Sequence, residues 1–395
     1  MRRNALLVLA APVVASALVL SGCGSASSSS SSSPPEDTAG SSAGSATEEA
    51  PSDAASSSAE AEVVATVTAS SIGKDWVTWD TVSCSFVSAT DPGTGWVGNV
   101  VKADEPWKFG FATQSETLAS VLTQLGEKLK AAATAANVDL IFGNNDLGGA
   151  NQNTAPLTES QRIAQQDPAV FGSFDIVESR LPAVLKPFVD KCIPVVQLEA
   201  AAEGTVFVGT DNETDGKMAG DYLADWAIAK GWDPASTLVV GAFQAGLPEN
   251  LNRRLRACEE AIVAKMPGAK VEEFNVGDKF TASTLANFGD FLTAHPDSTQ
   301  MLVCTMADLF ATGVAQEAVN SNRAEQVAVV GHLATDEGKE IIRKGGPMIG
   351  SVDIDFTNLG IYALAVAQDI KNGLAVPDKI YPGIRIVDAS NVDAS

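Results

Sequence analysis

The chain has 395 residues, of which 26 are basic and 49 acidic, giving a formal net charge of −23 at pH 7. A chain of this length can form two lobes with separate hydrophobic cores. Its acidic surface would repel phosphate backbones, so we expect no nucleic-acid partner. Because there are only two histidines and no cysteine pair with zinc-finger spacing, we also expect no metal site, no cofactor and no histidine-based catalysis.

The first 22 residues have the features of an export signal. Arg2 and Arg3 precede an apolar run over residues 5–20, which is too short and too one-sided in charge for a stop-transfer helix. The sequence Leu20-Ser21-Gly22-Cys23 resembles the lipobox of bacterial lipoproteins. That resemblance implies that Cys23 carries a lipid and anchors the mature chain to the outer face of the cytoplasmic membrane. The alternative is an ordinary secretory signal with a chance cysteine.

Residues 23–62 consist mainly of Ser, Ala, Glu, Pro, Thr and Gly, which predicts a disordered tether. A flexible coil of about 40 residues spans roughly 35 Å. A pre-segment over residues 63–104, which contains three tryptophans, is expected to pack on the first lobe. Within it, residues 93–98 match the dinucleotide-binding fingerprint, but they follow polar residues rather than an apolar strand, so we interpret them as a loop.

After residue 105, short apolar runs alternate with helical patterns. Strands are expected at residues 109–112, 138–142, 169–174, 193–198, 206–208, 238–243, 270–274, 301–304, 327–330, 349–352 and 384–387. Helices are expected at about residues 118–129, 181–191, 215–230, 251–262, 285–292, 311–319 and 359–370. The alternation is typical of an α/β fold with parallel sheets covered on both faces. The break in the series predicts two doubly wound lobes, whose ligand would lie beyond the carboxyl ends of the strands.

Several segments resemble the ribose-type, or type I, periplasmic solute-binding proteins. The most specific are Val208-Gly209-Thr210-Asp211-Asn212 and the run from Gly216 to Ala224, which are similar to that family's crossover and helix opening. Further similar segments are residues 193–196, 292–297, 308–313, 329–331 and 381–382. The resemblance covers roughly residues 107–387 and implies a hinge of three chain crossings, near residues 208–210, 353–356 and 382–384. It places residues 105–209 and 355–383 in the first lobe, and residues 210–354 and 384–395 in the second.

The resemblance implies two main ligand-binding residues. Arg254 lies where the family has its ligand arginine, and a guanidinium suits vicinal hydroxyls or a carboxylate. We expect Arg254→Ala to abolish ligand-induced stabilisation and to leave the fold intact. Glu199 lies at the position of the family's ligand aspartate, although Ala200 replaces the arginine that follows it there. Glu199 is therefore either a ligand contact or a bridge between the lobes. For Arg254, the alternative to a ligand contact is an ordinary solvated residue on the helix surface.

Other candidates for ligand contact come from strand ends and loops. They are Thr210 at the crossover, Phe280 as a ring that could stack on a sugar, and Gln114, Glu116, Asn144 and Asp308. The polar residues among them could equally be ordinary caps, and Phe280 could be part of the core.

Three positions depart from the family. Where the family has asparagine, aspartate and glutamine, this chain has Ala307, Leu333 and Ile354. A site built for hydroxyl groups loses affinity when hydrogen-bonding partners are missing. We therefore expect a ligand other than ribose, which is either less hydroxylated or differently oriented.

Four cysteines remain besides Cys23 and allow three pairings. The lobe boundaries favour Cys84 with Cys192 and Cys258 with Cys304, because each pair then lies within one lobe and leaves the hinge free. Free buried thiols are the alternative.

The resemblance implies a monomeric binding protein without enzymatic activity. It would capture a small polar ligand, such as a sugar or a sugar-like molecule, and deliver it to the permease of an ABC importer. A sensory receptor that presents a similar molecule to a membrane histidine kinase or chemoreceptor is the alternative.

Overall fold

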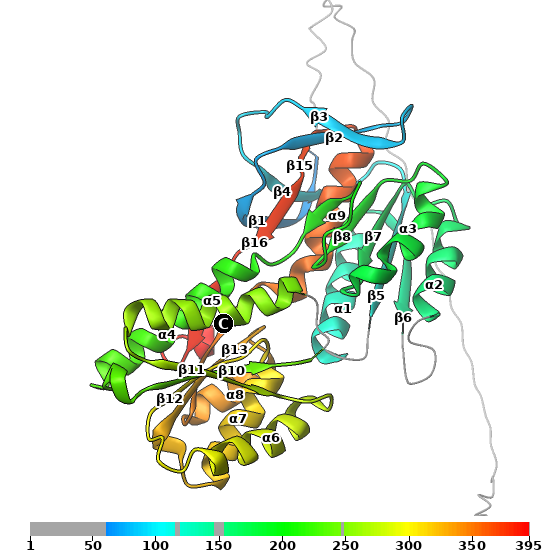
Figure 1. Ribbon diagram of the computed structural model, residues 1–395. Coiled ribbons are helices and arrows are strands. Elements are labelled where there is room, and N and C mark those ends of the chain that lie inside the picture. Colours follow the sequence, from blue (N-terminus) through cyan, green and yellow to red (C-terminus); the bar gives the residue numbers. More distant parts are fainter. Residues whose placement is uncertain (1–60, 115–118, 146–153, 246–248, 395) are drawn as a thin grey trace, which may run out of the picture. The chain divides into compact units, whose positions relative to one another are not determined.

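The structure is a computed structural model that describes residues 61–114, 119–145, 154–245 and 249–394, except for the side chains at positions 114, 119, 120, 144 and 145. Within these ranges the chain forms two large β-sheets and one small sheet. Helices cover both faces of each large sheet (Figure 1). None of the described helices is long and apolar enough to cross a membrane.

The first large sheet has the strand order β4-β1-β16-β9-β8-β7-β5-β6. Its strands are β1 (Val63–Ile72), β4 (Val97–Val101), β5 (Trp107–Gln114), β6 (Val138–Asn145), β7 (Val170–Phe174), β8 (Val195–Leu198), β9 (Val206–Val208) and β16 (Lys379–Pro382). The strands from β16 to β6 pair in parallel, whereas β1 pairs antiparallel with both β16 and β4. Helices α1 (Ala119–Ala135) and α9 (Leu359–Lys371) cover one face, and α2 (Ala155–Ala164) and α3 (Leu181–Val189) cover the other (Figure 1).

The second large sheet has the strand order β11-β10-β12-β13-β14-β17. Its strands are β10 (Leu238–Phe243), β11 (Lys270–Asn275), β12 (Met301–Cys304), β13 (Val327–His332), β14 (Met348–Asp353) and β17 (Arg385–Asp388). Only β17 runs antiparallel to its neighbour. Helices α4 (Asn212–Ala229) and α5 (Glu249–Lys265) lie on one face, and α6 (Phe280–Ala294), α7 (Asp308–Asn320) and α8 (Asp336–Lys344) lie on the other (Figure 1).

The expected pre-segment contains strands that the apolar pattern did not indicate. Strands β1 and β4 extend the first large sheet, while β2 (Trp76–Asp80) and β3 (Ser85–Ala89) form the small sheet with β15 (Val376–Pro377). The residues of the dinucleotide-like motif form a turn that runs into β4, where Gly93 and Gly95 adopt positive φ angles. Single 3-10 turns lie at Glu178–Arg180, Pro234–Ser236, Ala324–Gln326, Phe356–Asn358 and Val392–Ala394.

The chain passes between the two large sheets three times. It leaves the first sheet after β9, returns to it between β14 and α9, and leaves again between β16 and β17. These crossings lie at residues 209–211, 354–358 and 383–384, which overlap the predicted ranges 208–210, 353–356 and 382–384. The prediction of two wound lobes joined by a three-crossing hinge is therefore confirmed.

Helices α4 and α5 pack at close range because α4 has glycines on the shared face. A methyl group at Gly216 would overlap the carbonyl oxygen of Arg254, and one at Gly220 would overlap the carbonyl oxygen of Cys258. Only glycine permits this approach of two helix backbones. The contact places Asp215 of α4 beside Arg254 of α5, so the helix packing builds part of the site described below.

Two disulfides join the cysteine pairs that the lobe boundaries favoured. Cys84, in the turn between β2 and β3, bonds to Cys192, which follows α3. Cys258 of α5 bonds to Cys304 at the end of β12, and both of these residues are fully buried. Each disulfide therefore ties together elements that lie on the same side of the three crossings.

One buried carboxylate on α5 should make the stability of the protein depend on pH. Burial and the nearby Glu273 carboxylate raise the pKa of Glu259 to about 7, against the opposing effect of Arg256. A carboxyl whose pKa is higher in the folded than in the unfolded state stabilises the fold below its unfolded pKa. This contribution is lost as the pH rises, here between about 4.5 and 7.

We therefore expect Glu259→Gln to raise the free energy of unfolding by about 2 kcal/mol at pH 8 and to have little effect at pH 4. Urea unfolding at the two pH values measures the difference. The matched control is Glu260→Gln on the same helix, because Arg253 lowers the pKa of Glu260 and so no such gain should appear. A Glu259→Gln variant that is less stable than the original chain at pH 8 would contradict the prediction.

Candidate ligand-binding site between the sheets

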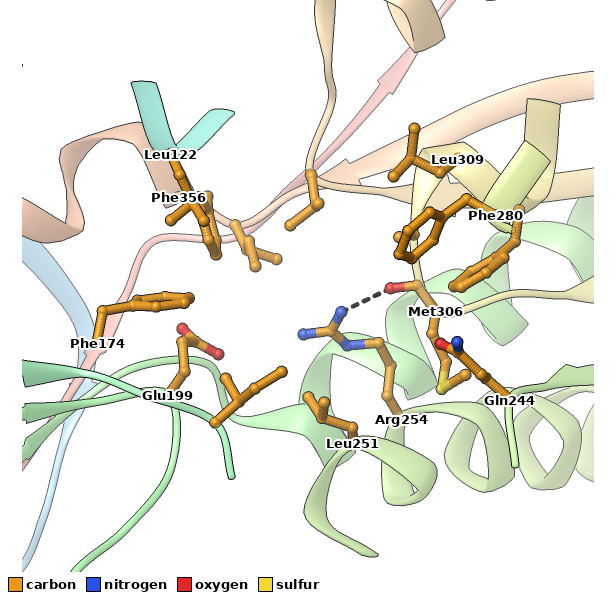
Figure 2. Close-up of a pocket in the computed structure, with 15 residues that line it drawn as sticks. Leu122, Phe174, Glu199, Gln244, Leu251, Arg254, Phe280, Met306, Leu309 and Phe356 are labelled. Carbon is orange, nitrogen blue, oxygen red and sulfur yellow. Dashed lines mark hydrogen bonds between the residues drawn. The ribbon is translucent and has the colours of Figure 1, made fainter. Parts of the chain in front are cut away.

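A pocket of about 790 Å³, including its open mouth, lies between the two large sheets (Figure 2). Its walls come from the carboxyl ends of parallel strands: Phe174 ends β7, Glu199 follows β8, Gln244 follows β10 and Leu333 follows β13. Helices α1, α5, α6 and α7, the loops after β7 and β12, and two residues of the second crossing contribute the rest. The other lining residues are Leu122, Ile176, Leu251, Arg254, Phe280, Met306, Ala307, Leu309, Phe310, Ile354 and Phe356. The pocket thus lies where wound sheets are expected to bind ligands.

Arg254 is held in the pocket wall by a buried polar network. Its Nε lies 2.6 Å from Asp215 Oδ2, and its Nη1 donates to the carbonyl oxygen of Met306 at 2.9 Å. His332 Nδ1 lies 2.9 Å from the other oxygen of Asp215. Burial raises the pKa of Asp215, but the charges of His332 and Arg254 outweigh it, so the net shift is downward. The guanidinium is consequently fixed, and it points into the pocket (Figure 2).

Glu199 faces Arg254 from the opposite wall (Figure 2). One of its carboxylate oxygens, Oε1, accepts hydrogen bonds from the backbone N and the Oγ1 of Thr210, each 3.1 Å long. Burial raises the pKa of Glu199, and the charge of Arg254 opposes this shift. Asn250 of α5 also donates a hydrogen bond to the Glu199 carbonyl oxygen at 3.2 Å. Glu199 therefore lines the pocket and also contacts a helix on the other side of the cleft.

Three residues that line the pocket adopt positive φ angles. These angles are 63° for Glu199, 46° for Phe280 and 92° for Leu333. Such a conformation costs a residue with a side chain about 1–2 kcal/mol. Strain of this kind concentrates at functional sites, where the surrounding structure enforces it. These three backbone conformations therefore support the pocket as the candidate site.

Most of the pocket wall is apolar. Among its described lining residues, only Glu199, Gln244 and Arg254 have polar side chains. On one side of the pocket, the rings of Phe174 and Phe356 pack edge to face with their centroids 5.6 Å apart. On the other side, the ring centroids of Phe280 and Phe310 are 6.0 Å apart. The three residues that depart from the family pattern also line the pocket, namely Ala307, Leu333 and Ile354.

The structure brings together only some of the predicted ligand-binding residues. Arg254, Glu199 and Phe280 line the pocket, and Thr210 supports Glu199 from behind. The carboxylate of Asp308 instead accepts hydrogen bonds from Ser351 Oγ and from the backbone N and Oγ1 of Thr335, at 2.6 to 2.9 Å. Burial raises its pKa to about 6. Asp308 thus holds the loop that follows Leu333 and does not itself line the pocket.

The side chains of the remaining candidates lie outside the part of the chain that the structure describes. Gln114 and Asn144 lie near the carboxyl ends of β5 and β6, but their side chains are outside the described residues, as are Glu116 and the proposed lipidation site Cys23.

The sequence did not identify the aromatic walls or the partner of Arg254. Phe174 was expected to end a strand, and ligands bind at the carboxyl ends of such strands. Its position in the sequence could therefore have identified it as a pocket residue. For Phe310 and Phe356 no signal separated a pocket wall from the core. The sequence placed Asp215 only at the start of an expected helix, although it is fully buried.

Two wound lobes joined by three crossings, with a pocket where their strand ends face each other, define a solute-binding protein of the type I periplasmic class. Residues 109–375 match the family described as periplasmic binding protein domain, so the chain belongs to this family. It is a binding family without enzymatic activity, and its members act outside the cytoplasmic membrane. Comparison with curated proteins gives no match.

Solved structures agree with this assignment. The chain is similar to an ABC transporter solute-binding protein from Mycobacterium smegmatis with bound glycerol, at 23% identity and a TM-score of 0.63, over 73% of this chain and 96% of that one. It is also similar to one from Actinobacillus succinogenes 130z with bound D-allose, at 18% identity and a TM-score of 0.62, over 73% and 99%. A third, from Bacillus halodurans C-125 with bound myo-inositol, has 18% identity and a TM-score of 0.61, over 74% and 98%. At these identities the similarity establishes the fold.

Proposed function

We propose that this protein is a monomeric lipoprotein, anchored through Cys23 outside the cytoplasmic membrane, which captures a small molecule in the cleft and delivers it to the permease of an ABC importer. The observation that carries the proposal is the pair of Glu199 and Arg254, which face each other from the two sides of the pocket. A ligand that bonds to both residues would hold the lobes together. The glycerol, D-allose and myo-inositol in the similar structures support a ligand of sugar-like size.

The proposed lobes are residues 105–209 with 355–383, and residues 210–354 with 384–395. Rotation about the three crossings would close them over the ligand, because each disulfide and each large sheet lies on one side of the crossings, where residues 63–104 join the first lobe. The acidic surface gives no support to a nucleic-acid partner.

Ligand-induced closure tests this function. We expect at least one compound in a panel of sugars, polyols and less hydroxylated ring compounds to raise the melting temperature of the full-length protein and to reduce its radius of gyration in small-angle scattering. A ligand present at a hundred times its Kd stabilises the fold by about 2.7 kcal/mol, which is readily measured. If no compound in the panel produces both effects, the proposal fails.

The membrane anchor and the partner need separate tests. We expect Cys23→Ala to move the protein from the membrane fraction to the soluble fraction of the producing cells, because the lipid would no longer be attached. An original chain that is itself soluble would contradict the anchor. Crosslinking of the ligand-loaded protein to an ABC permease supports import, whereas crosslinking to a histidine kinase would establish the sensory alternative instead.

A further inference from the structure

The wall of the pocket on the second-sheet side is built for an apolar surface. Phe280, Met306, Ala307, Leu309, Phe310 and Leu333 form it, and the described polar side chains on this side are Arg254 and Gln244. A ligand that lies between the two lobes must press one face against this wall. Every hydroxyl group on that face would lose its bonds to water without gaining a partner from these side chains, which lowers affinity about tenfold or more for each group.

Part of the hydrogen-bonding capacity of Glu199 and Arg254 is already used within the protein. Arg254 Nε lies 2.6 Å from Asp215 Oδ2, Arg254 Nη1 donates one hydrogen bond to the carbonyl oxygen of Met306, and Glu199 Oε1 accepts two hydrogen bonds from Thr210. Arg254 Nη2, as a donor, and Glu199 Oε2, as an acceptor, have no hydrogen-bond partner among the described residues and are available to a ligand. They face each other across the cavity, so they match two neighbouring polar groups on one edge of a ligand (Figure 2).

The charges around this pair favour a neutral ligand. Asp215 balances Arg254 within the protein, and burial raises the pKa of Glu199. An anionic ligand would face the Glu199 carboxyl, and the described lining residues include no unpaired cation that could compensate for its charge. A neutral hydroxyl group can accept a hydrogen bond from Arg254, while its neighbour donates one to Glu199.

We propose that the pocket binds a neutral ring compound with an apolar body and one polar edge, such as a vicinal diol, in preference to a fully hydroxylated sugar or polyol. The ring lies against Phe280, Phe310 and Leu333, and the diol edge bridges Arg254 and Glu199. This inference rests on the proposed function and specifies the class of its ligand.

Two probes with the same ring test the inference. The compounds are cis-cyclohexane-1,2-diol, with one polar edge, and myo-inositol, with a hydroxyl group on every carbon. In isothermal titration of the full-length protein, we expect the diol to bind at least tenfold more tightly than myo-inositol. Equal or tighter binding of myo-inositol overturns the inference but leaves the solute-binding function standing. If neither probe binds, the inference also fails, and the function fails with it only if the wider panel causes no closure.

Two variants show whether the apolar wall causes the preference. Phe280→Ala should weaken diol binding about tenfold, whereas Phe86→Ala in β3, the matched truncation away from the pocket, should leave it unchanged. Leu333→Asn adds an amide to the wall at a positive φ angle that asparagine tolerates better than leucine, so folding is preserved. It should weaken diol binding and strengthen myo-inositol binding. An unchanged ratio of the two affinities in Leu333→Asn would contradict the assignment of this wall.

Discussion

Replacing Arg254 with alanine is expected to lower the free energy of unfolding by about 3–5 kcal/mol, besides abolishing ligand binding. Arg254 is 4% exposed, and its Nε lies 2.6 Å from Oδ2 of Asp215, which is fully buried. Removing one partner leaves the buried Asp215 carboxylate without the charge of Arg254, and such a poorly compensated charge is costly. Urea unfolding of the variant, with and without ligand, measures both effects.

The neighbouring Arg253 supplies the control for this experiment. It lies on the same helix but is partly exposed and pairs with Glu213 and Glu260 at the surface. Surface pairs contribute little, so Arg253→Ala should change stability by less than about 1 kcal/mol. If Arg254→Ala unfolds at the same urea concentration as Arg253→Ala, the buried ion pair does not have the role described here.

A double replacement separates the charge from the ligand contact. Arg254→Met together with Asp215→Asn removes both charges and keeps similar side-chain volumes, so most of the lost stability should return. Ligand binding should not return, because the donor that faces Glu199 is still missing. A double variant that is no more stable than Arg254→Ala would show that lost packing, and not the unpaired carboxylate, causes the effect.

His332 should make the single variant sensitive to pH. Burial and the charge of Arg254 lower the pKa of His332, and Asp215 opposes them. Without Arg254, the pKa of His332 should rise, and its protonated form can compensate Asp215. We therefore expect Arg254→Ala to be less destabilised at pH 6 than at pH 8.

The sequence analysis expected this variant to leave the fold intact, and the structure revises that expectation. The resemblance could place Arg254 and Glu199 because each is attached to an element with a fixed position in the fold. It could not show that Asp215 pairs with Arg254, because this contact depends on the close packing of α4 and α5.

The central strands were predictable, and the peripheral elements were not. Residues 206–208, 238–243 and 301–304 form strands with the expected bounds, because strands buried on both faces are continuous apolar runs. Helix α8 was missed because it is mostly charged and buries only Gly338 and Ile342. Strand β1 was missed because it is largely Thr, Ser and Ala and only one of its residues is buried.

The apolar walls of the pocket escaped detection for a related reason. Leu309 and Phe310 lie in the first turn of α7, where an apolar residue that faces a cleft has the same sequence signature as one in the core. The departures at positions 307, 333 and 354 were the only indication of an apolar site, and they were recognised by comparison with a family pattern rather than by periodicity.

Removing the disulfide between Cys258 and Cys304 should destabilise the second lobe strongly. The two residues are 46 positions apart, and crosslinking a loop of that length lowers the entropy of the unfolded chain by the equivalent of about 4 kcal/mol. Both sulfurs are fully buried between α5 and β12, so the double variant Cys258→Ala with Cys304→Ala also loses packing in the core. We expect its free energy of unfolding to fall by at least about 4 kcal/mol in urea.

The other disulfide provides a comparison in which loop length and position make opposite predictions. Cys84 and Cys192 are 108 positions apart, so chain entropy alone predicts a larger loss, of about 5 kcal/mol. Cys84, however, lies in the turn of a hairpin whose sheet contains only one further strand, the two-residue β15. Without the bond, this hairpin can detach while the lobes stay folded. We therefore expect Cys84→Ala with Cys192→Ala to make residues 76–89 sensitive to protease and to leave ligand affinity unchanged. If this variant instead loses more global stability than the Cys258 and Cys304 variant, loop length rather than position in the fold governs the contribution of each bond.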